Sequence, residues 1–125
     1  MNKLYNDKGQ VAVLYSPRFG AGWSTWASAD IAEQVIFDGD IAKLVIEKES
    51  LRKEGNSNLD ESPKFDLIVS KIEKLSLEKF GEDFYPGGAA ALALAWVDTG
   101  VQFKIYEYDG KESIGFADKE IWIIA

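Results

Sequence analysis

Residues 101–116 read VQFKIYEYDGKESIGF and consist of two β-rich runs on either side of Asp109-Gly110. An Asp-Gly pair favours a two-residue type I′ hairpin loop, in which both loop residues have a positive φ. With that loop, the opposed pairs are Tyr108 with Lys111, Tyr106 with Ser113, Ile105 with Ile114, and Phe103 with Phe116. The two apolar pairs fall on one face of the pleat, so the turn and the side-chain pattern indicate the same register. We therefore predict an antiparallel hairpin.

Three other runs are typical of strands. Residues 11–15 (VAVLY) are continuously apolar, as in a buried strand, and residues 120–124 (EIWII) predict a final strand. Between the run that starts at residue 92 and the hairpin, a four-residue loop over 97–100 would oppose Trp96 to Val101, Leu94 to Phe103 and Leu92 to Ile105. A three-residue loop would pair alanines there and turn the leucines outward. We favour the four-residue loop, which makes an antiparallel meander.

Two segments between the first strand and the middle of the chain have helical spacing. One begins near Ile31, with Ser28 or Asp30 as its N-cap, and the next has Asp40 as its N-cap. In the second segment, the apolar positions form one stripe, which places three charged residues on the outer side: Lys43, Glu47 and Lys48.

A third helix is predicted over residues 64–80, with Gly81 placed to end it. Residues 52–63 (RKEGNSNLDESP) are polar and predict a mobile surface loop. The whole chain, residues 1–125, is then expected to be one α+β domain, an antiparallel β-meander sheet with two or three helices packed on one face.

Composition excludes several kinds of function. The chain has neither His nor Cys, which removes Ser-His-Asp and Cys-His nucleophilic sites, the usual zinc sites and any disulfide. The net charge of −7 is unfavourable for binding DNA or RNA polymers, which requires many Lys and Arg side chains. No apolar run approaches the roughly 20 residues that span a bilayer. We expect a cytoplasmic protein without a metal or a cofactor.

Residues 16–26 (SPRFGAGWSTW) contain part of a dinucleotide-binding fingerprint, but Thr25 stands where its third glycine is needed. The following chain does not return as βαβ units, so a Rossmann site is disfavoured. One remaining interpretation is an aromatic pocket in which rings stack a base while Arg18 and exposed backbone N–H groups take phosphates. The other is that Trp23 and Trp26 anchor the loop to the core, which composition alone favours.

Two further segments leave their role open. Residues 83–88 (DFYPGG) suit either a recognition loop or an ordinary turn. On the hairpin, Lys104, Tyr106 and Tyr108 share the face opposite Ile105, which predicts either a polar and aromatic platform or a solvated face. Glu107 and Glu112 are directly opposed and mildly repulsive, but no adjacent base or metal-binding motif makes them a catalytic pair.

Four stretches together resemble the first family of Thoeris anti-defence proteins, small phage and prophage proteins: VAVLYSPRFGAGWSTW, IFDGDIAKLV, EKFGEDFYPGGA and WVDTGVQFKIYEYDGKESI. The likeness covers residues 11–122, and FGAGWSTW and EYDG-x-ESI are its most specific parts. Arg18 stands where a small residue is usual in the family, and Lys104 where an arginine is common. A lysine gives up the bidentate phosphate contact of an arginine.

The resemblance implies a molecular sponge rather than an enzyme. Proteins of this family bind cyclic ADP-ribose isomers (glycocyclic ADP-ribose) made by bacterial TIR-domain defence proteins, so that the NAD-degrading effector is never activated. They are homo-oligomers built from dimers, with ligand pockets at subunit interfaces. Some form hexamers and hold cyclic trinucleotides of the CBASS defence pathway at a separate site.

Combining the resemblance with the residue patterns, we expect a ligand pocket with no catalytic residue. Its predicted residues are Arg18, Phe19, Gly22, Trp23, Trp26, Phe84, Tyr85, Gly88, Lys104 and Tyr108. Aromatic rings would stack the base, the two cations would meet phosphates, and the glycines would permit close backbone approach. Two alternatives are an enzyme that degrades the nucleotide signal with carboxylates such as Glu107 or Glu112, and a protein-binding inhibitor of the defence effector.

Overall fold

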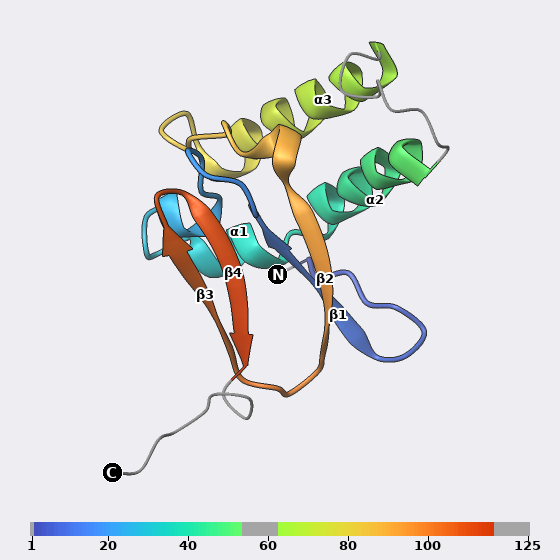
Figure 1. Cartoon of the computed structure of the whole chain (residues 1–125), viewed down its shortest axis with the longest axis vertical. Helices are drawn as coiled ribbons and strands as arrows, with labels where there is room; N and C mark the ends of the chain where they lie inside the picture. The colour runs from blue at the N-terminus through green and yellow to red at the C-terminus, as the bar shows by residue number, and fades with distance from the viewer. Residues whose placement is uncertain (1, 54–62, 117–125) are drawn as a thin grey trace.

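The computed structural model describes residues 2–53 and 63–116. In this part of the chain, helices and strands are mixed in an α+β fold, which confirms the predicted class (Figure 1). The elements in chain order are β1 (Gln10–Tyr15), the 3₁₀ turn η1 (Ser24–Trp26), α1 (Ala32–Phe37), α2 (Gly39–Lys53), α3 (Pro63–Phe80), the 3₁₀ turn η3 (Ala89–Ala91), β2 (Ala93–Asp98), β3 (Phe103–Tyr108) and β4 (Lys111–Phe116).

The hairpin β3–β4 has the predicted register. Phe103 pairs with Phe116, Ile105 with Ile114, and Tyr108 with Lys111. Asp109 and Gly110 both have positive φ, 50° and 86°, as a type I′ loop requires. The Asp-Gly turn and the apolar pairs, which are all close in the sequence, were therefore sufficient to predict the register of the hairpin.

Strand β2 does not pair with β3, so the predicted four-residue loop and its pairing of Trp96 with Val101 are wrong. Instead β2 lies antiparallel to β1, with Val11 opposite Val97 and Leu14 opposite Leu94. Among the described residues there are two separate two-stranded sheets, β1–β2 and β3–β4, rather than one continuous meander. The predicted final strand, 120–124, lies outside the described residues.

The packing around β1 explains this arrangement. Ala12 and Leu14 point into a core shared with the helices, where Val45 and Ile72 are also buried. Val11 and Val13 point to the other side, where the apolar face of the hairpin, Phe103, Ile105, Ile114 and Phe116, packs on them. Because α2 and α3 pack on one face of the β1–β2 sheet, while the hairpin and Phe37 of α1 pack on the other, β1 is apolar at consecutive positions (Figure 1).

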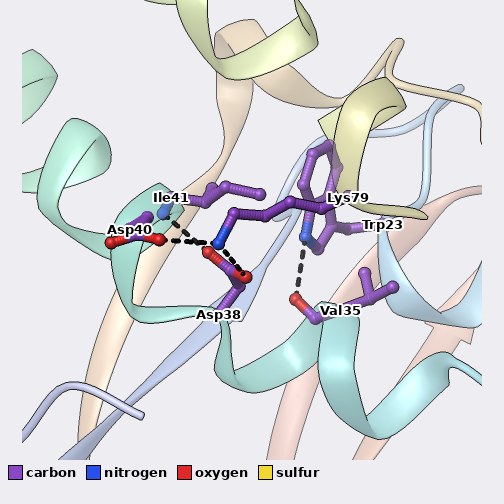
Figure 2. Close-up of polar contacts among 6 residues, drawn as sticks. All are labelled: Trp23, Val35, Asp38, Asp40, Ile41 and Lys79. Carbon is purple, nitrogen blue, oxygen red and sulfur yellow. Dashed lines mark hydrogen bonds and ion pairs between the residues drawn. The ribbon is translucent and has the colours of Figure 1, made fainter. Parts of the chain in front are cut away.

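The helix caps differ from those predicted. The N-cap of α1 is Ile31, which provides no side-chain hydrogen bond, so neither Ser28 nor Asp30 caps it through a side chain. The cap of α2 is Asp38 rather than Asp40, because the backbone N–H of Ile41 donates to Oδ1 of Asp38 at 2.9 Å (Figure 2).

Asp38 and Asp40 share a cation with the third helix. The ammonium of Lys79 donates to Oδ2 of Asp38 at 2.9 Å and to Oδ2 of Asp40 at 2.6 Å (Figure 2). The hydrogen bond and charge of Lys79 lower the pKa of Asp40. Partial burial lowers the pKa of Lys79, but the hydrogen bonds that its ammonium donates to the two carboxylates outweigh this, so the pKa is raised. This cluster ties the start of α2 to the end of α3.

Lys48 was predicted on the outer side of α2, and this is wrong. Its side chain is fully buried, and its ammonium donates to the carbonyl oxygens of Ala89, Ala90 and Leu92 at 3.2, 2.9 and 2.6 Å. The 3₁₀ turn η3 directs these carbonyls toward one point, and a buried ammonium with several hydrogen bonds can satisfy them there. Lys48 therefore connects α2 to the segment that leads into β2.

Helix α3 and its end agree with the prediction. Gly81 has a φ of +100°, and its N–H donates to the carbonyl of Leu77 at 3.0 Å. Of the predicted surface loop 52–63, residues 52, 53 and 63 are helical instead, because α2 continues to Lys53 and α3 starts at Pro63; residues 54–62 lie outside the described residues. Over the described ranges, no helix has the length and apolar character needed to cross a membrane.

Candidate ligand-binding surface

Three loops far apart in the sequence meet at one end of the molecule, which we call the loop end: residues 16–26, 84–88 and 107–111 (Figure 1). The N–H of Gly20 donates to the carbonyl of Asp109 at 2.7 Å, which joins the first loop to the hairpin turn. Gly88 and Gly22 are in backbone contact, since a Cβ on Gly88 would lie 3.1 Å from the carbonyl oxygen of Gly22. The loop end therefore brings together most of the predicted site segments.

A buried carboxylate organises the loop end. Glu112 is 1% exposed, and its Oε1 accepts the N–H of Ser16 at 2.8 Å. Its Oε2 accepts the N–H of Trp23 at 2.8 Å, the N–H of Thr25 at 3.0 Å and the hydroxyl of Thr25 at 2.6 Å. One interpretation of the sequence had exposed backbone N–H groups of this loop taking phosphates; these three N–H groups cannot do so, because they donate to Glu112.

The opposed pair Glu107 and Glu112 exists as predicted, but each carboxylate has its own donors. Glu107 Oε1 accepts the N–H of Gly110 at 2.7 Å and, more weakly, the indole N–H of Trp26 at 3.4 Å. Strong N–H donors offset the repulsion of two facing carboxylates. The hairpin register in the sequence predicted that Glu107 and Glu112 face each other, but no sequence pattern indicated their hydrogen-bond donors. The donors to Glu112 lie about ninety positions earlier in the chain.

Two of the predicted aromatic residues belong to the core. Trp23 is completely buried, and its indole N–H donates to the carbonyl of Val35 at 3.2 Å (Figure 2). Its ring meets the buried ring of Phe84 edge to face, with centroids 4.9 Å apart. Both side chains are buried in the core, where they anchor their loops, and neither is at the surface.

Four other predicted residues form two exposed aromatic pairs at the loop end. Trp26 and Tyr85 are 43% and 50% exposed, and their ring centroids lie 5.5 Å apart. Phe19 and Tyr108 are 60% and 76% exposed and meet edge to face at 6.1 Å. Exposed rings of this size in neighbouring loops are typical of a binding surface rather than of a core.

The cations at the loop end are only partly those predicted. Arg18 is exposed on the first loop. Lys111, which was not predicted, places its ammonium 5.2 Å from the centroid of the Phe19 ring. The signal for it was present in the sequence, because the hairpin register sets Lys111 directly opposite Tyr108.

Gly22 is needed for packing within the first loop, and Gly88 for packing between two loops. A Cβ on Gly22 would lie 2.7 Å from Cδ1 of Trp26, so this position lets the indole ring fold over the loop. At Gly88 a Cβ would press on the backbone of the first loop. The space that these glycines leave is filled by the protein itself.

Lys104 lies beside a cavity of about 930 Å³ between α1, η1 and β3. The cavity is lined by Ser24, Thr25, Ala32, Glu33, Ile36, Phe37, Val101, Gln102, Phe103, Lys104, Ile105 and Gly115. Of the ten predicted site residues, it includes only Lys104. None of the four exposed aromatic residues lines this cavity, although Ser24 and Thr25 of the first loop do.

Within the described residues, no group of three or more Asp and Glu side chains is arranged to hold a metal ion. The surface offers aromatic faces and isolated cations, which suit a flat, anionic small molecule. In comparisons of the chain with protein-family models, with curated proteins and with solved structures, nothing matched.

Proposed function

We propose that this protein is a sponge that binds a cyclic ADP-ribose isomer of the glycocyclic type and withholds it from a defence effector without degrading it. The observation that supports this most is the loop end, where two exposed aromatic pairs, Trp26 with Tyr85 and Phe19 with Tyr108, flank a loop that also contains Arg18. The resemblance to Thoeris anti-defence proteins supplies the ligand class.

In this proposal the adenine base stacks on the exposed rings and the pyrophosphate is met by side-chain cations. Lys111 lies close to the Phe19 ring, so a base on that ring places its phosphates within reach of an ammonium. The backbone N–H groups of Ser16, Trp23 and Thr25 do not take part, because Glu112 accepts them.

A sponge is favoured over a nucleotide-degrading enzyme by the environment of Glu112, one of the two candidate carboxylates. Glu112 accepts four hydrogen bonds while fully buried, and Glu107 accepts the N–H of the hairpin turn. A general base has to reach the proton that it abstracts. Glu112 is surrounded by donors inside the protein and is therefore poorly placed for that role, whereas Glu107 is exposed.

From the resemblance we further propose that the protein acts in the host cytoplasm as a homo-oligomer built from dimers, and that a hexamer could hold cyclic trinucleotides at a second site. The exposed rings of the loop end are consistent with a pocket completed by another subunit, since such rings are often covered in an assembly. DNA and RNA polymers are disfavoured as partners by the charge of −7.

The test is to incubate the purified protein with glycocyclic ADP-ribose, remove unbound material, heat the sample and analyse what is released. The sponge proposal expects the intact molecule in a fixed ratio to protein, with no turnover of excess ligand. Release of hydrolysed nucleotide would indicate the degrading enzyme instead. Capture of the defence effector in the absence of nucleotide, with no retained ligand, would indicate the protein-binding inhibitor.

A further inference from the structure

The carboxylate of Glu112 closes the first loop of the loop end. It accepts the N–H of Ser16, where the loop begins, and the N–H groups of Trp23 and Thr25, where it ends. The backbone N–H of Glu112 also donates to the carbonyl of Ser16 at 2.7 Å. The residues between these anchor points include Arg18 and Phe19, and Trp26 follows immediately.

This arrangement is an anion site that the protein fills with its own side chain. Convergent backbone N–H groups form a concave site that favours a negative oxygen. Hydrogen bonds from N–H groups to a carboxylate are stronger than those between neutral partners. Without the carboxylate, the donors of Ser16, Trp23 and Thr25 would lose their acceptor in a place where water has little access, as Ser16 and Trp23 are fully buried.

We propose that Glu112 is a positioning residue for ligand binding: its carboxylate fixes the loop in the shape that presents Phe19 and Trp26, without touching the ligand itself. The ligand part of this inference rests on the proposed sponge function. A loop that is ordered before binding does not have to be ordered by the ligand, which increases affinity. Loss of Glu112 therefore weakens binding by loosening the loop.

The principal variant is Glu112→Ala, which removes a fragment with the size and charge of acetate. Hydrogen exchange is expected to accelerate at the amides of Ser16, Trp23 and Thr25, while the amides of Val13 and Val97 keep their protection. Affinity for glycocyclic ADP-ribose is expected to fall at least about tenfold, mainly through faster dissociation.

Acetate gives the decisive second measurement. Added to Glu112→Ala, it is expected to restore amide protection in the loop and ligand affinity, whereas chloride at the same ionic strength is not. The matched control is Asp38→Ala, which removes another mostly buried carboxylate that accepts a backbone N–H, but at the start of α2. This control is expected to lower the unfolding temperature and to leave ligand affinity unchanged.

If Glu112→Ala does not fold, Thr25→Val serves instead, because it removes one donor to Glu112 and keeps the shape of the side chain. It is expected to accelerate loop exchange and weaken affinity by a smaller factor. Unchanged loop exchange in the folded variant, or equal loss of affinity in Asp38→Ala, would overturn the inference. If the wild type retains no nucleotide, the sponge proposal fails, while exchange and acetate rescue still decide whether Glu112 positions the loop.

Discussion

Trp26 and Tyr85 lie against each other across two loops, with ring centroids 5.5 Å apart and ring planes inclined by 36°. Each side chain remains about half exposed. The two tryptophans of the first loop thus have different roles, because Trp23 is buried against Phe84 and only Trp26 presents a face to solvent. This pair, like Phe19 with Tyr108, offers exposed aromatic faces for the base of the proposed ligand.

Replacing Trp26 with Ala is expected to cost about 1–3 kcal/mol of binding free energy for glycocyclic ADP-ribose, the usual value of one base–aromatic stack. Titration calorimetry measures it. Trp96→Ala is the matched control, since Trp96 is also a partly exposed tryptophan, at 37%, but lies on β2. Equal losses in the two variants would argue against stacking at the loop end.

Lys111 and Lys104 make a second matched pair on the same hairpin. Lys111 lies beside Phe19, whereas Lys104 lines the cavity between α1, η1 and β3, which none of the exposed aromatic residues lines. Lys111→Met is expected to weaken ligand binding about tenfold and to reduce its dependence on salt concentration, because one phosphate contact is lost. Lys104→Met is expected to bind as the wild type does. The reverse result would place the phosphates at the cavity instead.

The hairpin and the third helix could be predicted because their signals are local. Asp109-Gly110 fixes the turn, the apolar pairs fix the register, and Gly81 ends α3. The pairing of β2 with β1 could not be predicted in the same way. It is set by the burial of β1 between helices and hairpin, and partners such as Val11 and Val97 are far apart in the sequence.

The candidate site, too, has some features with local signals in the sequence and others that depend on contacts between distant segments. Aromatic and glycine-rich loops can be recognised in a sequence, and Phe19, Trp26, Tyr85 and Tyr108 are indeed exposed. Whether a given tryptophan packs or faces solvent depends on contacts with distant segments. The hydrogen bonds to Glu112 depend on three-dimensional placement in the same way, and no periodicity in the sequence reports them.

Gly110 is expected to be far more sensitive to substitution than Gly100, although both have a similar positive φ, 86° and 88°. A Cβ on Gly110 would lie 2.5 Å from the backbone nitrogen of Ala21, whereas Gly100 has open space around it. Gly100→Ala should therefore cost only about 1–2 kcal/mol of backbone strain, and Gly110→Ala about 1–3 kcal/mol more from the clash. Urea unfolding compares the two variants, and equal costs would mean that the loop contact contributes nothing.

Lys48 provides a test of the buried ammonium. Lys48→Met keeps most of the side-chain volume but removes the donor to three carbonyls, so it is expected to lower the free energy of unfolding by about 1–3 kcal/mol. Lys43→Met, at an exposed position on the same helix, should change it by less than about 0.5 kcal/mol. Thermal unfolding of both variants at one pH gives the comparison. A Lys48→Met protein as stable as the wild type would show that burying this ammonium cancels its hydrogen bonds.

The contribution of Lys79 to stability is expected to depend on pH at both ends of the range. The pKa of Asp40 is lowered in the folded protein, first by its hydrogen bond to Lys79, so this stabilisation is present above the ordinary Asp pKa of 3.8 and is lost as pH falls through the lower folded value. The pKa of Lys79 is raised, so the stabilisation from its ammonium is fully present below the ordinary Lys pKa of 10.5 and is lost as pH rises through the higher folded value.

The difference in unfolding free energy between the wild type and Lys79→Met should therefore be constant from about pH 5 to pH 9 and shrink outside that window. Because Asp40 is half exposed, salt should reduce the difference as well. A difference that is the same at pH 3 and pH 7 would mean that Lys79 stabilises α3 by packing alone.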